Sequence, residues 1–271
     1  MAKLDTNAAW KEAAAIVSAN REVLLALAGV FFMLPSLALA VIAGEPEMIP
    51  GTKPEQMMAA MSEFYARWWW IILLSAVFQI VGLMAILTLM RDRSRPTVGE
   101  AIRAGLPGAL SYLATQLVVV VGLSLLGGVL IGVAAAISPM LAVVVALLFG
   151  LAMIFAVFRL ILVAPVIAVE GVLNPLTAMI RSWRLTNGNF WRILGFLLLI
   201  VILFAVVAGI IMMIVGLILA LASSGEPQRI IAAVFSSALG AVGVVYFAGV
   251  ISAIHRQLGG PAAADLSATF E

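Results

Sequence analysis

The residues with the clearest chemical potential are two charged side chains in or beside one long apolar segment, Pro139–Val169. Arg159 and Glu170 are separated by about three turns of helix, so an unbroken helix would place them on one face. Asn174 would continue that face if the helix did not restart at Pro175. Ionisable groups at membrane depth are costly and often functional. The pattern predicts a polar site for a lipid headgroup or a small anion, or alternatively a snorkelling arginine and an interfacial glutamate.

Two glutamines are the other strongly polar groups inside apolar segments. Gln79 and Gln116 each lie within a stretch long enough to cross a bilayer. Such side chains most often form hydrogen bonds between membrane helices. The alternative is that they line a path for a small solute or a lipid, together with Arg159 and Glu170.

The composition explains why so few residues are candidates. The chain has 271 residues, of which 65% are hydrophobic and 10% charged, whereas soluble domains are about half apolar and a quarter charged. This excludes a soluble enzyme, a nucleic-acid-binding protein and a disordered chain. Cysteine is absent, which excludes disulfides and thiolate chemistry, and no motif for a metal or a cofactor is present. The expected protein is a non-enzymatic, polytopic membrane protein without a cofactor or a metal ion.

The elements that must position the polar residues are membrane-spanning helices. About 20 apolar residues cross the hydrocarbon core, and continuous apolar runs favour helices over strands. The fourth segment exceeds this length, so we expect a kink, with Pro165 as its cause. The fold class is therefore all-α with six transmembrane helices, at Val23–Ala43, Trp69–Met90, Leu110–Ile137, Pro139–Val169, Ile193–Ala222 and Ile230–Ile254.

The first span also has the apolar core of a secretory signal peptide, with small residues after it. The segment before it is long and contains Asp5, Glu12 and Glu22, which is untypical of a signal peptide. We therefore expect this span to be retained, and cleavage is the alternative.

Basic residues predict the orientation, because they concentrate in cytoplasmic loops. Three lie in the loops assigned to the outside, Lys53, Arg67 and Arg229. Eleven lie on the assigned inner side, namely Lys3, Lys11, Arg21, Arg91, Arg93, Arg95, Arg103, Arg181, Arg184, Arg192 and Arg256. Both termini are therefore expected in the cytoplasm of a bacterial cell, with the protein in the inner membrane.

Three cytoplasmic segments have similar amphipathic patterns, and each leads into a span. They begin at Thr6, Thr97 and Asn174, which are suitable helix caps. Each predicts a short interfacial helix. The chain is thus expected to be one membrane domain with a possible threefold hairpin repeat, over residues 1–91, 92–170 and 171–256, and a flexible tail at 257–271. The alternative is that inner loops are generally basic and amphipathic. The expected apolar stripes are Trp10, Ala13, Ala14 and Val17; Val98, Ala101, Ile102 and Leu106; and Leu176, Met179, Ile180 and Trp183.

A longer pattern covers about 35 residues, from Arg159 through Pro165 and Glu170 to Leu194. It includes Ala-x-x-x-Ser-x-x-Leu-x-x-Gly, formed by Ala178, Ser182, Leu185 and Gly188. The pattern resembles the membrane domain that precedes the catalytic barrel in some bacterial glycerophosphodiester phosphodiesterases, and related inner-membrane proteins. The resemblance implies the membrane module alone, without hydrolase activity.

These observations predict an inner-membrane protein that engages a lipid or another amphiphile, or acts as an accessory component of a membrane complex. Arg181, Arg184 and Arg192 are expected to face anionic headgroups, each contributing about 1 kcal/mol near the surface. The expected partners are membrane lipids, with a membrane protein or a second copy of the chain as further possibilities and no nucleic acid. A small-solute or lipid transporter is the alternative function.

Overall fold

The computed structural model describes residues 3–44, 53–91, 97–222 and 224–259, and every regular element within these ranges is a helix. Six helical segments are long and apolar enough to cross a membrane, which confirms the predicted fold class. They are Arg21–Ile42, Pro54–Arg91, Val98–Ile137, Pro139–Glu170, Phe190–Ala222 and Glu226–Gly259.

The elements follow the predicted order. The first span consists of α2 (Arg21–Ala28), the π-helical turn η1 (Gly29–Met33) and α3 (Leu34–Ile42). The other elements are α1 (Thr6–Ala19), α4 (Pro54–Arg91), α5 (Val98–Ile137), α6 (Pro139–Arg159), α7 (Val163–Glu170), α8 (Pro175–Leu185), α9 (Phe190–Ala222) and α10 (Glu226–Gly259).

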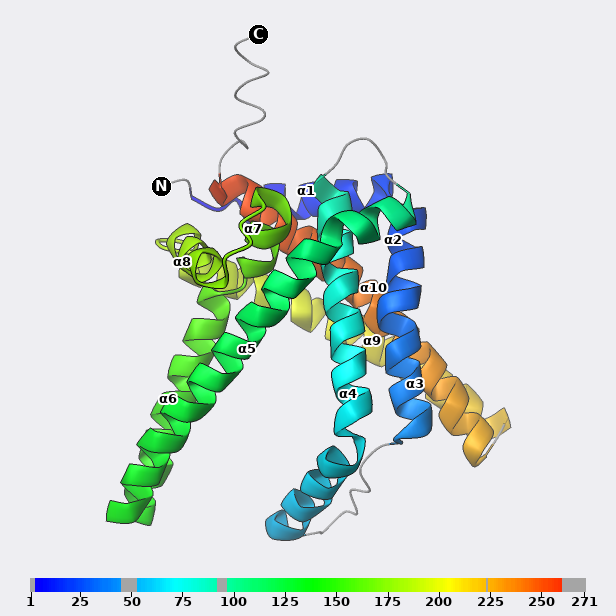
Figure 1. The fold of residues 1–271 in the computed structure, drawn as a ribbon. Coiled ribbons are helices and arrows are strands. Elements are labelled where there is room, and N and C mark those ends of the chain that lie inside the picture. Colours follow the sequence, from blue (N-terminus) through cyan, green and yellow to red (C-terminus); the bar gives the residue numbers. More distant parts are fainter. Residues whose placement is uncertain (1–2, 45–52, 92–96, 223, 260–271) are drawn as a thin grey trace, which may run out of the picture.

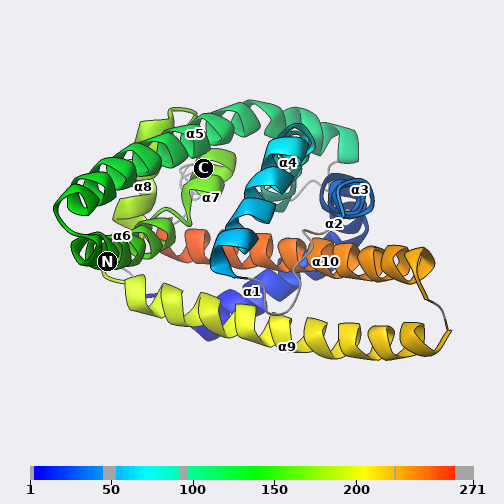
Figure 2. The ribbon, with the colours of Figure 1, turned by 90° about the horizontal axis from the view of Figure 1, so that it is seen from below.

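The spans form antiparallel hairpins that converge at one end and spread apart at the other (Figure 1). The short helices α1, α7 and α8 lie at the converging end. Seen from below, the α5–α6 and α9–α10 hairpins run along separate sides of the molecule (Figure 2). The core is at the converging end, where Met84–Met90, Val163–Ala168 and Ala248–His255 are largely buried. The spread ends expose apolar side chains, as expected for surfaces that contact lipid. The threefold repeat stays a prediction.

Glycines permit the closest helix contact in this core. A Cβ atom on Gly105 of α5 would lie 2.8 Å from the Ala85 nitrogen and 2.9 Å from the Met84 carbonyl carbon of α4. A Cβ atom on Gly82 would lie 2.3 Å from Cβ of Phe31 in η1. The backbones of α4 and α5 therefore touch where only glycine fits.

The second predicted interfacial helix is not a separate element, which corrects the expectation of three short helices. The segment beginning at Thr97 is the first part of α5, and Pro107 lies inside that helix without ending it. The predicted capping box is confirmed: the Thr97 hydroxyl accepts from the Glu100 N–H at 3.4 Å, and the Thr97 N–H donates to the Glu100 carboxylate at 2.8 Å.

Helix α1 is a separate short helix, but its cap and its buried face differ from the prediction. Asp5, rather than Thr6, accepts hydrogen bonds at the N-terminus, from the backbone N–H groups of residues 7 and 8. The buried stripe is Ala9, Ala13 and Val17. Trp10 is 38% exposed and its ring stacks on Tyr246. Small residues face α10 because the two helices pack closely at Gly249, whose added Cβ would lie 3.1 Å from the Val17 side chain.

The fourth span breaks earlier than predicted. Helix α6 ends at Arg159 and α7 begins at Val163, so Pro165 lies in the first turn of α7 and not at the kink itself. Proline has no N–H to donate to the carbonyl four residues earlier, which is Ile161. The break therefore falls one turn before the proline. The predicted tail is partly helical, since α10 includes residues 257–259, and residues 260–271 lie outside the described residues.

Candidate functional site

The break between α6 and α7 separates the two charged residues that the sequence placed on one face. Arg159 points toward the turn after α8, where its Nη1 donates to Thr186 Oγ1 at 3.3 Å and its Nη2 to Asn187 Oδ1 at 3.5 Å. Glu170 instead contacts Arg181. The residues predicted to form one polar site therefore lie in different environments.

Arg159 connects α6 to α8. Its side chain is 8% exposed, and its guanidinium lies 4.6 Å from the ring centroid of Trp183 and 5.6 Å from that of Phe155. Its backbone carbonyl accepts from the hydroxyls of Ser182 and Thr186 at 2.9 and 3.3 Å. Among the described residues, no carboxylate lies within ion-pair distance of Arg159. Cation–π contacts and neutral hydrogen bonds thus compensate the buried charge.

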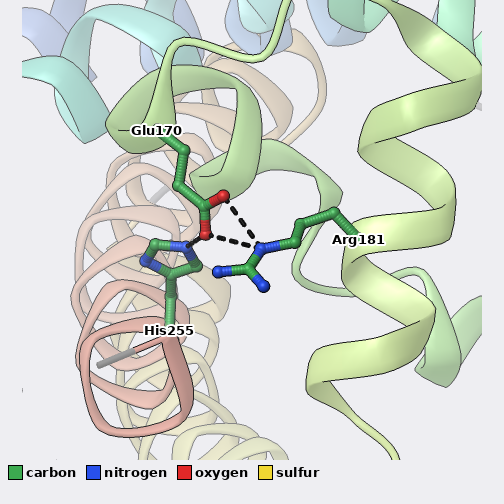
Figure 3. A network of polar contacts seen from close by, with 3 residues as sticks. All are labelled: Glu170, Arg181 and His255. Atoms are coloured by element: carbon green, nitrogen blue, oxygen red, sulfur yellow. Dashed lines mark hydrogen bonds and ion pairs between the residues drawn. The ribbon is translucent and has the colours of Figure 1, made fainter. Parts of the chain in front are cut away.

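Glu170 joins three helices (Figure 3). Its carboxylate accepts from Arg181 Nε of α8 at 3.0 and 3.2 Å and lies 2.9 Å from His255 Nε2 of α10. We call Glu170, Arg181 and His255 the Glu170 cluster. An ionised carboxylate only accepts hydrogen bonds, so Nε2 is the donor to it.

The position of His255 in the sequence, beside Arg256 at the end of the last predicted span, predicts a surface side chain, and the structure corrects this prediction. It is 4% exposed, because α10 carries it into the core at the converging end. Its partner Glu170 is 85 residues away in the sequence, so no local spacing indicates the pair. The end of an apolar span, next to a charged residue, is where interfacial side chains usually lie, so the local sequence indicates exposure and not burial.

Asn174 and Gln79 have separate positions. The Asn174 side chain accepts from the Thr177 N–H at 3.1 Å and caps α8, as its place before Pro175 predicted. Gln79 lies on α4 and is half-buried. Neither residue contributes to the two cavities described below.

The three arginines predicted to face lipid headgroups also differ. Arg181 belongs to the Glu170 cluster. Arg192 donates to the Leu4 carbonyl at 3.4 Å and so connects α9 to the segment before α1. Arg184 is exposed and, among the described residues, has no carboxylate within ion-pair distance. Arg184 is therefore the most available cation of the three.

Helix α8 turns its apolar stripe outward, whereas its small residues face the core. Ala178, Ser182 and Leu185 are buried. These three residues belong to the Ala-x-x-x-Ser-x-x-Leu-x-x-Gly motif that carries the family resemblance. The motif therefore corresponds to the face of α8 that packs against the core. Ile180 and Trp183, from the predicted apolar stripe, are exposed. An outward apolar stripe is typical of a helix in contact with lipid.

An open cavity of about 500 Å³ lies between this outward face of α8 and α5, with the end of α6 beneath it. We call it the lateral groove. Among the described residues that line it, only Trp183 and Arg184 contribute strongly polar groups, and the Trp183 ring is the one that lies against the Arg159 guanidinium. The other lining residues are apolar: Val118, Val119, Gly122, Leu123, Leu126, Ala156, Leu160, Met179 and Ile180.

A smaller cavity of about 150 Å³, the inner cavity, lies behind the groove. Tyr112, Thr115 and Gln116 of α5 supply its polar lining. The remaining lining residues are Leu83, Val119, Leu123, Ala156, Val157, Leu160, Ile161, Val163, Ala164, Phe247 and Ile251. Gln116 thus lines a cavity, and its predicted hydrogen bond to another helix is not observed among the described contacts.

The groups that line the lateral groove are those of an amphiphile-binding surface. Within the described ranges, no group of three or more histidine and acidic side chains could hold a metal ion. The groove combines an apolar wall, an indole and a guanidinium at one end, which are the groups that an amphiphile requires.

The fold and these cavities define an all-helical, multi-pass membrane module. Residues 135–255 match the family model described as the membrane domain of glycerophosphoryl diester phosphodiesterase. The match includes α6 to α9 and the part of α10 that carries His255, and it confirms the resemblance carried by Arg159–Leu194. The matched family is the membrane part of such enzymes and not their catalytic part. No curated protein and no solved structure matches the chain significantly.

Proposed function

We propose that this protein is a non-enzymatic membrane module that binds an anionic phospholipid. One acyl chain lies in the lateral groove, and the lipid phosphate lies beside Arg184. The observation that carries the proposal is the position of a cation without an ionic partner, among the described residues, at the rim of an apolar groove. The end of the protein that carries α1 and α8 would face the cytoplasm, as the distribution of basic residues indicates.

The position of each group in the groove supports this assignment. Trp183 and Arg184 are amphipathic side chains of the kind found at the membrane interface. Gly122 and Leu126 lie farther along α5, away from the turn that joins α8 to α9. A phospholipid has the same order, with its phosphate at the interface and its chains toward the bilayer centre. A transport path is less well supported, because Arg159, Glu170, Gln79 and Gln116 do not line one cavity.

Filling the groove tests the proposal. Gly122→Leu adds a side chain where a Cβ atom meets nothing within 4 Å, so the protein should fold while the groove is occupied. We expect labelling by a photoactivatable phosphatidylglycerol in nanodiscs to fall about tenfold at groove peptides. Gly128→Leu is the matched control, because Gly128 is equally open but does not line the groove. Equal labelling of both variants would contradict the assignment.

Removing the rim charge tests the headgroup preference. Arg184→Gln should reduce phosphatidylglycerol labelling about fivefold, because one cation near the surface contributes about 1 kcal/mol. Labelling by phosphatidylcholine, which has no net charge, should change little. Arg103→Gln removes another exposed cation that does not line the groove, so it should leave both signals unchanged. A preference for phosphatidylglycerol that survives in Arg184→Gln would refute the role of Arg184.

A further inference from the structure

We infer that the inner cavity is a second binding site, selective for the uncharged, hydroxyl-bearing end of a long-chain amphiphile. This site is next to the proposed anionic-lipid site in the lateral groove, but it differs from that site in the headgroup that it would bind and does not depend on Arg184. The inference follows from the polar lining of the cavity, its lack of charge and its position next to the groove.

The polar lining is uncharged and comes from one helix face. Tyr112, Thr115 and Gln116 offer a phenol, a hydroxyl and a carboxamide, and Thr115 already donates to the Ser111 carbonyl at 2.9 Å. The phenol and the carboxamide hydrogen-bond to each other, and each can still donate or accept a further hydrogen bond. They match a hydroxyl group, which also donates and accepts.

The lack of charged lining residues disfavours an anionic ligand in this cavity. Of the described residues that line it, none is charged. A phosphate or a carboxylate would lose its hydration without meeting a counter-ion, which is far more costly than burying a hydroxyl that finds hydrogen bonds. The two cavities therefore differ in selectivity, because the groove has Arg184 and the inner cavity has neutral partners only.

The shape of the cavity favours an amphiphile over water alone. A volume of about 150 Å³ could hold several waters, but each buried water needs two or more polar partners. Here the polar groups lie on α5, and the opposite wall is apolar, formed by Phe247 and Ile251 of α10 and by residues around α7. An alcohol with an attached alkyl chain satisfies both walls.

Access is possible from the membrane side. Val119 and Leu123 of α5, with Ala156 and Leu160 at the end of α6, line both the inner cavity and the lateral groove. A chain lying in the groove therefore reaches the inner cavity by displacing these apolar side chains. No route through water is needed.

Photolabelling with a matched pair of probes tests the inference. The first probe is hexadecanol with a diazirine next to its hydroxyl end, and the second is the corresponding alkyl phosphate. In nanodiscs, we expect the alcohol to label peptides containing Leu83 and Phe247, and the phosphate to label the groove. Gln116→Met is nearly isosteric and should lower labelling by the alcohol at the inner cavity about fivefold, because it removes one buried hydrogen-bonding partner.

A second variant and a control separate binding from folding. Tyr112→Phe removes only the phenol oxygen and should lower the same signal about threefold. Gln79→Met changes a glutamine of a membrane span that lines neither cavity, so its labelling should equal that of the wild type. Unchanged labelling in both Gln116→Met and Tyr112→Phe, or equal labelling of the inner cavity by the alkyl phosphate, would overturn the inference. Loss of the phosphatidylglycerol preference in Arg184→Gln tests the groove alone, because Arg184 does not line the inner cavity, so the two proposals can fail separately.

Discussion

Replacing Gly105 by alanine is expected to lower the free energy of unfolding by about 3 kcal/mol. The added Cβ would lie 2.8 Å from the Ala85 nitrogen and 2.9 Å from the Met84 carbonyl carbon. Both are backbone atoms within the core of α4, so relief requires the movement of a whole helix and not of one side chain. Reversible unfolding in mixed micelles, followed by circular dichroism, measures the change.

The sign of this effect is informative, because alanine is the better helix former. In an open helical position, glycine to alanine stabilises by up to about 1 kcal/mol. Gly99 lies in the first turn of the same helix, and a Cβ atom there meets nothing within 4 Å. Gly99→Ala is therefore the control, and it should be neutral or stabilising. If both variants behaved alike, the close contact of α4 and α5 would be wrong.

The same contact positions the candidate sites. Helix α5 carries the polar lining of the inner cavity and one wall of the lateral groove, while Gly105 and Gly108 hold its first part against Met84. A shift of α5 would therefore change both cavities at once. This is why Gly122→Leu, which fills the groove without touching the core, is the sharper test of lipid binding.

The membrane spans and two of the helix N-termini could be predicted from the sequence, because hydropathy and local capping residues determine them. Continuous apolar runs are sufficient to place spans, because every backbone polar group in a membrane must be satisfied within a helix. The caps at Thr97 and Asn174 were also readable, since each depends on residues within one turn. Asn174 is also a candidate site residue by its spacing from Glu170, but in the structure its side chain caps α8.

Properties that depend on distant contacts were not predictable from the sequence. The period of α8 gave an apolar stripe, but not whether the stripe faces the core or the lipid. In the structure the small face of Ala178 and Ser182 packs inward. The pairing of Glu170 with His255 depends on how α7 and α10 cross. The interruption of the helix between α6 and α7 removes the common face that Arg159 and Glu170 would have in one continuous helix.

Loss of the Glu170 carboxylate is the second large effect that we expect. Glu170→Leu should lower the free energy of unfolding by about 2 kcal/mol, because it leaves the buried His255 Nε2 without its acceptor. The Nδ1 atom of the same ring is already buried without a partner, so the ring could not compensate through its other nitrogen. Glu170→Gln keeps an acceptor oxygen and should cost less than about 1 kcal/mol.

A nearby ion pair supplies the matched control for this prediction. Arg256 of α10 pairs with Glu12 of α1 at 3.4 Å, and both side chains are about one-third exposed. Water screens such a pair, so Glu12→Leu should cost less than about 1 kcal/mol. If Glu12→Leu lowered the free energy of unfolding as much as Glu170→Leu, the effect of Glu170→Leu would come from the loss of a charge near α10 and not from the buried imidazole.

A double-mutant cycle identifies which contact of Glu170 is important. Arg181 is 41% exposed and can be hydrated when its partner is lost, whereas His255 cannot. We therefore expect a coupling energy of about 1 kcal/mol or more between Glu170→Leu and His255→Phe, and a smaller one between Glu170→Leu and Arg181→Gln. If the coupling to Arg181 were the larger of the two, the main contribution of Glu170 would be its exposed ion pair with α8. If the coupling to His255 is the larger, as we expect, the main contribution is the buried contact between α7 and α10. Through Arg181 of α8, the same cluster also supports one wall of the lateral groove.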